Sequence, residues 1–117
     1  MSKHANAYQI FLNLCHAIDE LTGLPKLTPD EKFIIKIMNN YWVNNKPITV
    51  VQAMSAVGTQ STSTVFRNLK KIRQKGYIQL VVDDEDNRIK YIQPTEQVMK
   101  YFHEHGKLLI KTAKNFS

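Results

Sequence analysis

The most constraining feature of the sequence is the segment from Ser61 to Pro94, which joins a basic helical pattern to two short β-rich runs. Apolar residues at positions 65, 69 and 72 recur at helical spacing, so one face of this helix is expected to pack inward. Gly76 follows at a position where helices often end on a left-handed residue. The pattern therefore predicts one basic helix that ends at Gly76 and is followed directly by strands.

The residues after Gly76 predict a β-hairpin. Two runs rich in β-branched and aromatic residues, at 77–82 and 89–92, are separated by a short polar segment. That segment, Asp83 to Asn87, consists of acids and an asparagine, which suit a tight turn. A basic helix followed by a hairpin is the layout of a winged helix, whose helix enters the major groove of DNA while the hairpin tip reaches a minor groove. The predicted fold class is mainly α with a small β-hairpin.

The exposed side of the basic helix carries groups that can contact a polyanion. Four hydroxyl residues, 61–64, form its first turn; Ser61 or Thr62 can cap the free amides, and the others can donate to phosphates or base edges. Lys75 falls in the last turn, where a cation complements the helix dipole. The side opposite the apolar stripe is expected to hold Thr62, Ser63, Phe66, Arg67 and Lys70, with Lys71 further along.

A set of spaced residues in this segment carries a family resemblance. The set comprises Ser63-Thr64-Val65, Arg67, Leu69, Lys75-Gly76, Asp83, Glu85-Asp86, Arg88 and Thr95. With this spacing the chain resembles the MarR-type winged-helix transcription regulators. The resemblance implies a homodimeric DNA-binding protein, usually a repressor, that responds to a ligand or an oxidant. By position, Arg88 resembles the wing arginine that enters the minor groove, and Asp86 resembles the acid that orients it.

Three differences from the family pattern affect the expected base readout. Leu80 and Val81 stand where many members have arginines, and Asn68 replaces an apolar residue on the recognition helix. Phe66 replaces a small polar residue on the exposed side of that helix. An exposed phenylalanine could contact a thymine methyl group, or it could pack under the hairpin and never reach DNA. We slightly favour the base contact.

The distribution of charge supports a polyanionic partner. The net charge is +6, and the interval between Lys32 and Val82 contains no Asp or Glu. The acids are confined to the two ends of the chain and the hairpin tip. A solvated basic surface is the ordinary alternative, but the cations converge on one helix that begins with hydroxyls, which favours nucleic acid. The basic residues of the interval are Lys32, Lys36, Lys46, Arg67, Lys70, Lys71, Arg73 and Lys75.

The remaining elements are expected to be helices. A chain of 117 residues fits one domain, 1–117, with a winged-helix core at 28–94 and flanking helices at 4–22 and 95–117. Thr28-Pro29-Asp30-Glu31 predicts a capping box, and the helix after it is apolar nearly all round, which predicts a central place in the core. Gly106 is expected to break or bend the last helix, whose apolar face should include Leu109. The flanking helices are the expected dimerisation elements; the alternative is that they pack on their own domain.

Several other classes of function are not supported. The single cysteine, Cys15, excludes an intrachain disulfide, and a small buried apolar role is favoured for it over redox sensing. No catalytic constellation, cofactor motif or metal-binding spacing is present, so no enzyme, cofactor or metal is predicted. No apolar run approaches the ~20 residues of a membrane span, and the N-terminus does not resemble a signal peptide, so a cytoplasmic location is expected. Trp42 and Tyr41 could line a ligand pocket, although plain core packing is the commoner role of such aromatics.

The sequence therefore predicts a homodimeric, sequence-specific binder of double-stranded DNA that regulates transcription, most simply as a repressor. Two alternatives remain: a winged-helix module that binds an acidic protein partner, and a plasmid or phage replication or partition factor. An effector is not identified by the sequence. The predicted DNA-binding residues are Ser61, Thr62, Ser63, Phe66, Arg67, Lys70, Lys71, Asp86 and Arg88.

Overall fold

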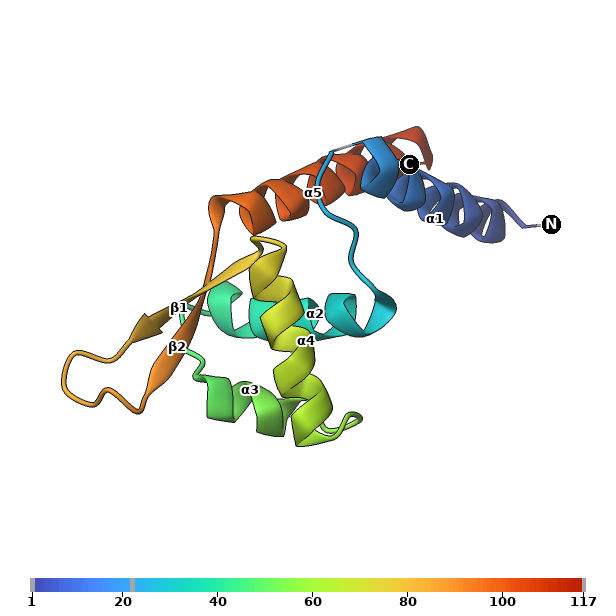
Figure 1. The fold of residues 1–117 in the computed structure, drawn as a ribbon. Coiled ribbons are helices and arrows are strands. Elements are labelled where there is room, and N and C mark those ends of the chain that lie inside the picture. The colour runs from blue at the N-terminus through green and yellow to red at the C-terminus, as the bar shows by residue number, and fades with distance from the viewer. Residues whose placement is uncertain (1, 22, 117) are drawn as a thin grey trace. The chain divides into compact units, whose positions relative to one another are not determined.

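A computed structural model describes residues 2–21 and 23–116, except the side chains of Leu21 and Phe116; Thr22, the last residue of the predicted 4–22 helix, lies outside the described residues. Within this part the chain forms helices and one antiparallel hairpin, which confirms the predicted mainly α fold class (Figure 1). The elements in chain order are α1 (Lys3–Leu21), α2 (Pro29–Val43), α3 (Val50–Ala56), α4 (Thr62–Gln74), β1 (Ile78–Val82), β2 (Lys90–Pro94) and α5 (Glu96–Phe116).

The backbone groups into two compact units. One unit is Leu27–Val98, which contains α2 to β2 and the first turn of α5. The other consists of Met1–Lys26 and Met99–Ser117, which contain α1 and the rest of α5. The predicted assignment of 1–117 as a single domain stays a prediction.

Helix α2 begins with the predicted capping box. Thr28 Oγ1 accepts a hydrogen bond from the Glu31 amide at 3.2 Å, and Glu31 Oε1 accepts one from the Thr28 amide at 2.8 Å. Its buried face consists of Glu31, Ile34, Ile35 and Met38. Ile34, Ile35 and Met38 lie in the core, as the predicted central place of α2 requires, whereas the apolar residues Phe33 and Val43 are exposed. Although apolar residues occur on nearly all sides of α2, only one stripe of the helix is buried in the winged-helix unit.

Helices α3 and α4 are also started by side-chain caps. Thr49 caps α3 through a second capping box with Gln52, and Ser61 caps α4. The predicted inward face of α4 is confirmed, because Val65, Leu69 and Ile72 are buried. Asn68, the polar departure on that face, is 9% exposed, and its amide donates to Gln60 Oε1 at 3.1 Å. A hydrogen bond therefore compensates the burial of this polar side chain.

The hairpin is attached to the helices through β2. Strands β1 and β2 pair antiparallel with Ile78 opposite Pro94, Leu80 opposite Ile92 and Val82 opposite Lys90. On the other edge of β2, the Ile92 amide donates to the Ile48 carbonyl at 2.8 Å, and Tyr91 forms a bridge with Thr49. The segment that precedes α3 thus acts as a short third strand, and it fixes the hairpin beside α3 and α4 within this unit (Figure 1).

A network of side-chain bonds surrounds the end of α4. Gly76 adopts a φ of +85°, as its predicted helix-ending role requires. Lys75 is the C-cap residue, and its ammonium donates to Glu31 Oε1 at 2.5 Å, so it neutralises a buried carboxylate as well as lying at the negative end of the helix. Gln97 donates to the Lys75 carbonyl, and Thr95 donates to the Gly76 carbonyl at 2.6 Å. The ion pair between Lys75 and Glu31 was not predicted from the sequence, because the two residues lie 44 positions apart.

The second unit is built from α1 and the greater part of α5. Helix α5 continues through Gly106, so the expected break is absent, because an isolated glycine lowers helix stability without interrupting the hydrogen bonds. The alternative, a bend at Gly106, stays a prediction. Leu108 is buried, whereas Leu109, expected on the apolar face, is exposed. The His105 Nδ1 lies 2.7 Å from the Tyr101 carbonyl, and its Nε2 lies 3.3 Å from Asp19 Oδ1. This histidine of α5 therefore contacts α1 within the unit, which is a structural role.

Candidate nucleic-acid interface

The outer face of α4 presents the side chains that the sequence assigned to DNA. Thr62, Ser63, Phe66, Arg67 and Lys70 are exposed, as is Lys71. Val65 and Ile72, on the opposite face, have no exposed area and anchor the helix in the core. The helix is thus held from one side and offers hydroxyl, apolar and cationic groups on the other.

The four hydroxyls of the first turn have separate roles. Ser61 Oγ accepts a hydrogen bond from the Thr64 amide at 3.2 Å and donates to Thr64 Oγ1 at 2.8 Å. Arg67 in turn donates from Nη2 to Thr64 Oγ1 at 3.4 Å, close to the upper limit for such a bond. Ser61 is therefore committed to capping the helix, which resolves the choice between Ser61 and Thr62. Thr62 and Ser63 lie on the exposed side of the turn.

The hairpin tip is folded around one carboxylate. Asp83 Oδ2 accepts hydrogen bonds from the amides of Glu85 and Asp86, each at 3.0 Å, and Asp83 Oδ1 accepts one from the Tyr91 hydroxyl at 3.2 Å. The two amides are the main cause that lowers the pKa of Asp83. The same carboxylate raises the pKa of Tyr91. One of the four acids at the tip is thus used internally to shape the turn.

A second acid at the tip holds the arginine next to it. Arg88 donates from Nε to Asp86 Oδ1 at 3.1 Å and from Nη2 to Asp86 Oδ2 at 3.0 Å, so the guanidinium is bound at two points. This hydrogen bonding lowers the pKa of Asp86 and raises the pKa of Arg88. The Arg88 side chain is nevertheless 90% exposed. The pair therefore orients an exposed cation at the end of the hairpin, as the predicted roles of Asp86 and Arg88 require.

Phe66 lies where α3, α4 and the hairpin meet. It borders a hollow of about 170 Å³ together with Leu69 of α4 and with Ile78, Leu80 and Lys90 of the hairpin. It also borders a wider hollow of about 510 Å³, whose other walls come from α3 and from the hairpin. From the sequence, Leu80 was expected only to lack the charge that many family members carry at this position. Its place beside Phe66 follows from strand alternation, since Leu80 shares a face with the buried Ile78.

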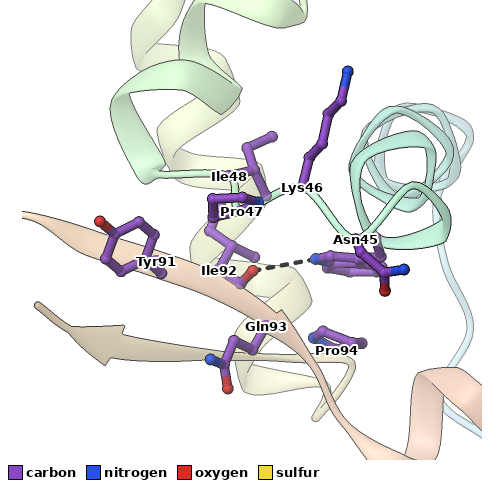
Figure 2. Close-up of a pocket in the computed structure, with 9 residues that line it drawn as sticks. Asn45, Lys46, Pro47, Ile48, Tyr91, Ile92, Gln93 and Pro94 are labelled. Carbon is purple, nitrogen blue, oxygen red and sulfur yellow. Dashed lines mark hydrogen bonds between the residues drawn. The ribbon is translucent and has the colours of Figure 1, made fainter.

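Another hollow, of about 560 Å³, lies between the end of α2, the turn that follows it and β2 (Figure 2). Trp42, one of the two aromatics proposed for a ligand pocket, lines it; its Nε1 donates to the Ile92 carbonyl at 3.2 Å. Tyr41 is not one of its lining residues. The indole thus ties α2 to β2, which is a structural role at the base of the hairpin. The hollow is lined by Trp42, Asn45, Lys46, Pro47, Ile48, Tyr91, Ile92, Gln93 and Pro94.

Among residues 2–21 and 23–116, no group of three or more His, Cys, Asp or Glu side chains is arranged to hold a metal ion. None of the helices in that same part of the chain combines the length and apolar character needed to cross a membrane.

The arrangement of helix, turn, helix and attached hairpin is that of a winged helix, and known structures share it. No protein-family model and no curated protein matches the sequence. A variant of MepR from S. aureus covers 98% of this chain and 82% of its own, at 16% identity and a TM-score of 0.62. A variant of MarR from E. coli, in complex with operator DNA, covers 97% of this chain and 81% of its own, at 15% identity and a TM-score of 0.55.

The heme sensor PefR from Streptococcus agalactiae, in complex with heme, covers 98% of this chain and 76% of its own, at 18% identity and a TM-score of 0.55. These proteins are MarR-family transcriptional regulators. The chain therefore has the fold of the MarR-type winged-helix regulators, which confirms the fold implied by the residues between Ser63 and Thr95. At these identities the likeness establishes the fold.

Proposed function

We propose that the protein is a homodimeric, sequence-specific double-stranded DNA-binding regulator of transcription that acts as a repressor in the cytoplasm. The observation that carries the proposal is the outward face of α4, where hydroxyls and cations are exposed together in a stretch without acids. The MarR variant with operator DNA supports the same class of partner through its fold. A surface of this kind attracts phosphates and can reach base edges.

The proposed interface divides its contacts between positioning and reading. Lys70 and Lys71 bind phosphates and set the register of the helix, together with the first-turn amides that Ser61 orders. Thr62, Ser63, Phe66 and Arg67 face the bases in the major groove. Arg88, oriented by Asp86, enters the adjacent minor groove, where a narrow A·T-rich groove attracts arginine. The remaining acids at the tip stay in solvent.

The proposed dimer uses the flanking unit. Its described residues include exposed large apolar side chains on both α1 and α5, which a second copy of the chain would cover. A two-fold axis would place two copies of α4 about one helical turn, roughly 34 Å, apart on a pseudo-palindromic site. A solution mass of one chain at micromolar concentration would contradict this part of the proposal. The exposed apolar residues are Tyr8, Ile10, Leu12 and Leu14 of α1 and Met99, Leu109 and Ile110 of α5.

Selection of binding sites from random duplex DNA tests the proposed function. The purified protein should enrich a sequence with two inverted half-sites whose centres lie about one turn, roughly 10 base pairs, or a multiple of it apart. Enrichment of a single unrepeated site would contradict the dimer and leave the DNA binding intact. No enrichment, combined with no shift of random duplex at low salt, would contradict DNA binding and favour an acidic protein partner.

A further inference from the structure

Phe66 is an unusual group for a surface that meets a polyanion. Its side chain is 45% exposed, and it stands between Ser63 and Arg67 on the outward side of α4. Cations surround it: Lys70 Nζ lies 5.0 Å from the ring centroid, and Arg73, Arg88 and Lys90 line the same hollows. A buried phenylalanine would need no further explanation, but this ring remains partly in water with hollow space on two sides.

The wider hollow beside the ring has an apolar floor. Val50, Val51 and Met54 of α3 line it together with Phe66, while Arg88 and Lys90 of the hairpin form a basic side. Val51 is exposed to an even greater extent than Phe66. An occupant that fits both parts must carry negative charge and also offer a small apolar group. Because the hollow adjoins the outward face of α4, a duplex bound there as proposed would supply both its phosphates and its base edges.

On the edges of the bases, one major-groove group is apolar, the methyl group at C5 of thymine. A ring that loses its water on binding is stabilised if it meets such a methyl group, and it gains nothing from the polar edge of an unmethylated pyrimidine. We propose that Phe66, with the apolar floor from α3, reads a pyrimidine 5-methyl group in each half-site, and that it therefore selects thymine over unmethylated pyrimidines. This inference rests on the proposed DNA binding and assigns Phe66 a specific role in it.

Lys70 covers one face of the Phe66 ring in the free protein and is expected to move away when DNA binds. In the free protein its ammonium is placed over one face of the ring, an arrangement that cation–π attraction stabilises. A phosphate provides a stronger partner for the ammonium than a ring does. Binding of the duplex would therefore draw Lys70 toward the backbone and leave the ring for the base edge.

Replacement of thymine by deoxyuridine tests the inference, because the change removes the methyl group and keeps the same hydrogen-bonding atoms. The duplex selected from random DNA is substituted at one thymine at a time, and its affinity is measured by fluorescence anisotropy at fixed salt. The wild-type protein should lose about fourfold in affinity at one position in each half-site, the effect of one buried methyl group. Phe66→Ala should bind the thymine duplex more weakly and show no loss at that position.

Two further variants separate base reading from packing. Phe66→Leu keeps an apolar side chain and should keep part of the discrimination, whereas Val43→Ala, which shortens an exposed apolar residue at the end of α2, should keep all of it. 5-Methylcytosine, which carries the same methyl group, should bind better than cytosine when either replaces the read thymine. Equal losses on deoxyuridine in wild type and Phe66→Ala, or no sensitive position, would overturn the inference and indicate packing under the hairpin. A wild-type protein that binds no duplex would overturn the proposed function as well.

Discussion

The cations on the outward face of α4 differ from the cation at its C-terminal end in whether the fold already neutralises them. Along the outward face, Arg67, Lys70 and Lys71 are exposed. At the C-terminal end, the Lys75 side chain is only 28% exposed and its ammonium is bound to Glu31, which has no exposed area. The sequence presents all of these residues as one basic run. A run of basic residues in the sequence shows how many cations are present. A binding surface depends instead on which of those cations are not already neutralised by another residue of the fold.

The largest expected effect is the loss of stability when Lys75, at the C-terminal end of α4, is replaced. Lys75→Met should lower the free energy of unfolding by about 2–3 kcal/mol, because it leaves the buried Glu31 carboxylate without its cation; the value lies below that of a fully buried pair since Lys75 is partly exposed. Lys71→Met, the same change at an exposed position of the same helix, should stay within about 0.5 kcal/mol of wild type. Urea unfolding of both variants measures the difference. Equal stabilities would contradict the structural role of Lys75.

The next largest effect is the loss of DNA affinity when Arg67, on the outward face of α4, is replaced. Arg67→Ala should weaken binding to the selected duplex by about 1–3 kcal/mol and relax the base preference at one position in each half-site, as expected for an arginine that reads guanine. Its unfolding free energy should be nearly unchanged, since the side chain is exposed. Repetition of the binding-site selection with this variant measures the preference. A loss of affinity that is uniform over all sequences would make Arg67 a phosphate contact instead.

A third prediction separates two effects of Asp86 on DNA binding: the orientation of Arg88 and the repulsion of phosphates by its negative charge. Asp86→Asn removes a negative charge, which by itself should favour DNA, but it also removes the carboxylate that holds the guanidinium at two points. We expect a loss of several-fold in affinity, greatest on A·T-rich flanks, where the minor groove is narrow. Asp84→Asn, at an exposed neighbouring acid, should leave affinity equal or improved. Tighter binding by both variants would show that the acids act only through repulsion.

The smallest expected effect is the response of stability to acid. Burial would raise the pKa of Glu31, but hydrogen bonds from Lys75 and Thr28 outweigh it and hold the pKa below its ordinary value of 4.5. The unfolded chain therefore binds a proton at this site before the folded chain does. The stabilisation by Glu31 is present above pH 4.5 and is lost as the pH falls through the lower folded value. Glu31→Gln should flatten this part of the curve in denaturation measurements, and Asp30→Asn should not.

Much of the fold follows from local signals. The capping box at Thr28 and the helix end at Gly76 were predicted, and Ser61 was one of the two caps predicted for α4, because each acts through its own neighbours in the chain. The side of α4 that faces outward was predicted for the same reason, by helical periodicity. These signals suffice to establish the winged-helix pattern.

The features that could not be predicted depend on residues that are distant in sequence. Glu31 and Lys75 are paired across 44 positions, and Trp42 binds the Ile92 carbonyl across 50. The DNA contacts of Ser61, Thr62, Ser63, Phe66, Arg67, Lys70, Lys71, Asp86 and Arg88 stay predictions.

The salt dependence of duplex binding tests the central claim most directly. The logarithm of affinity should fall steeply with the logarithm of salt concentration, with a slope of about −0.9 for each phosphate contacted. Lys71→Gln should reduce the magnitude of that slope by about 1.8, because the proposed dimer loses one phosphate contact in each of its two copies. Lys75→Met, made in the Glu31→Gln background to preserve folding, should leave the slope unchanged. A flat slope for the wild-type protein, or an equal reduction by both changes, would contradict the account.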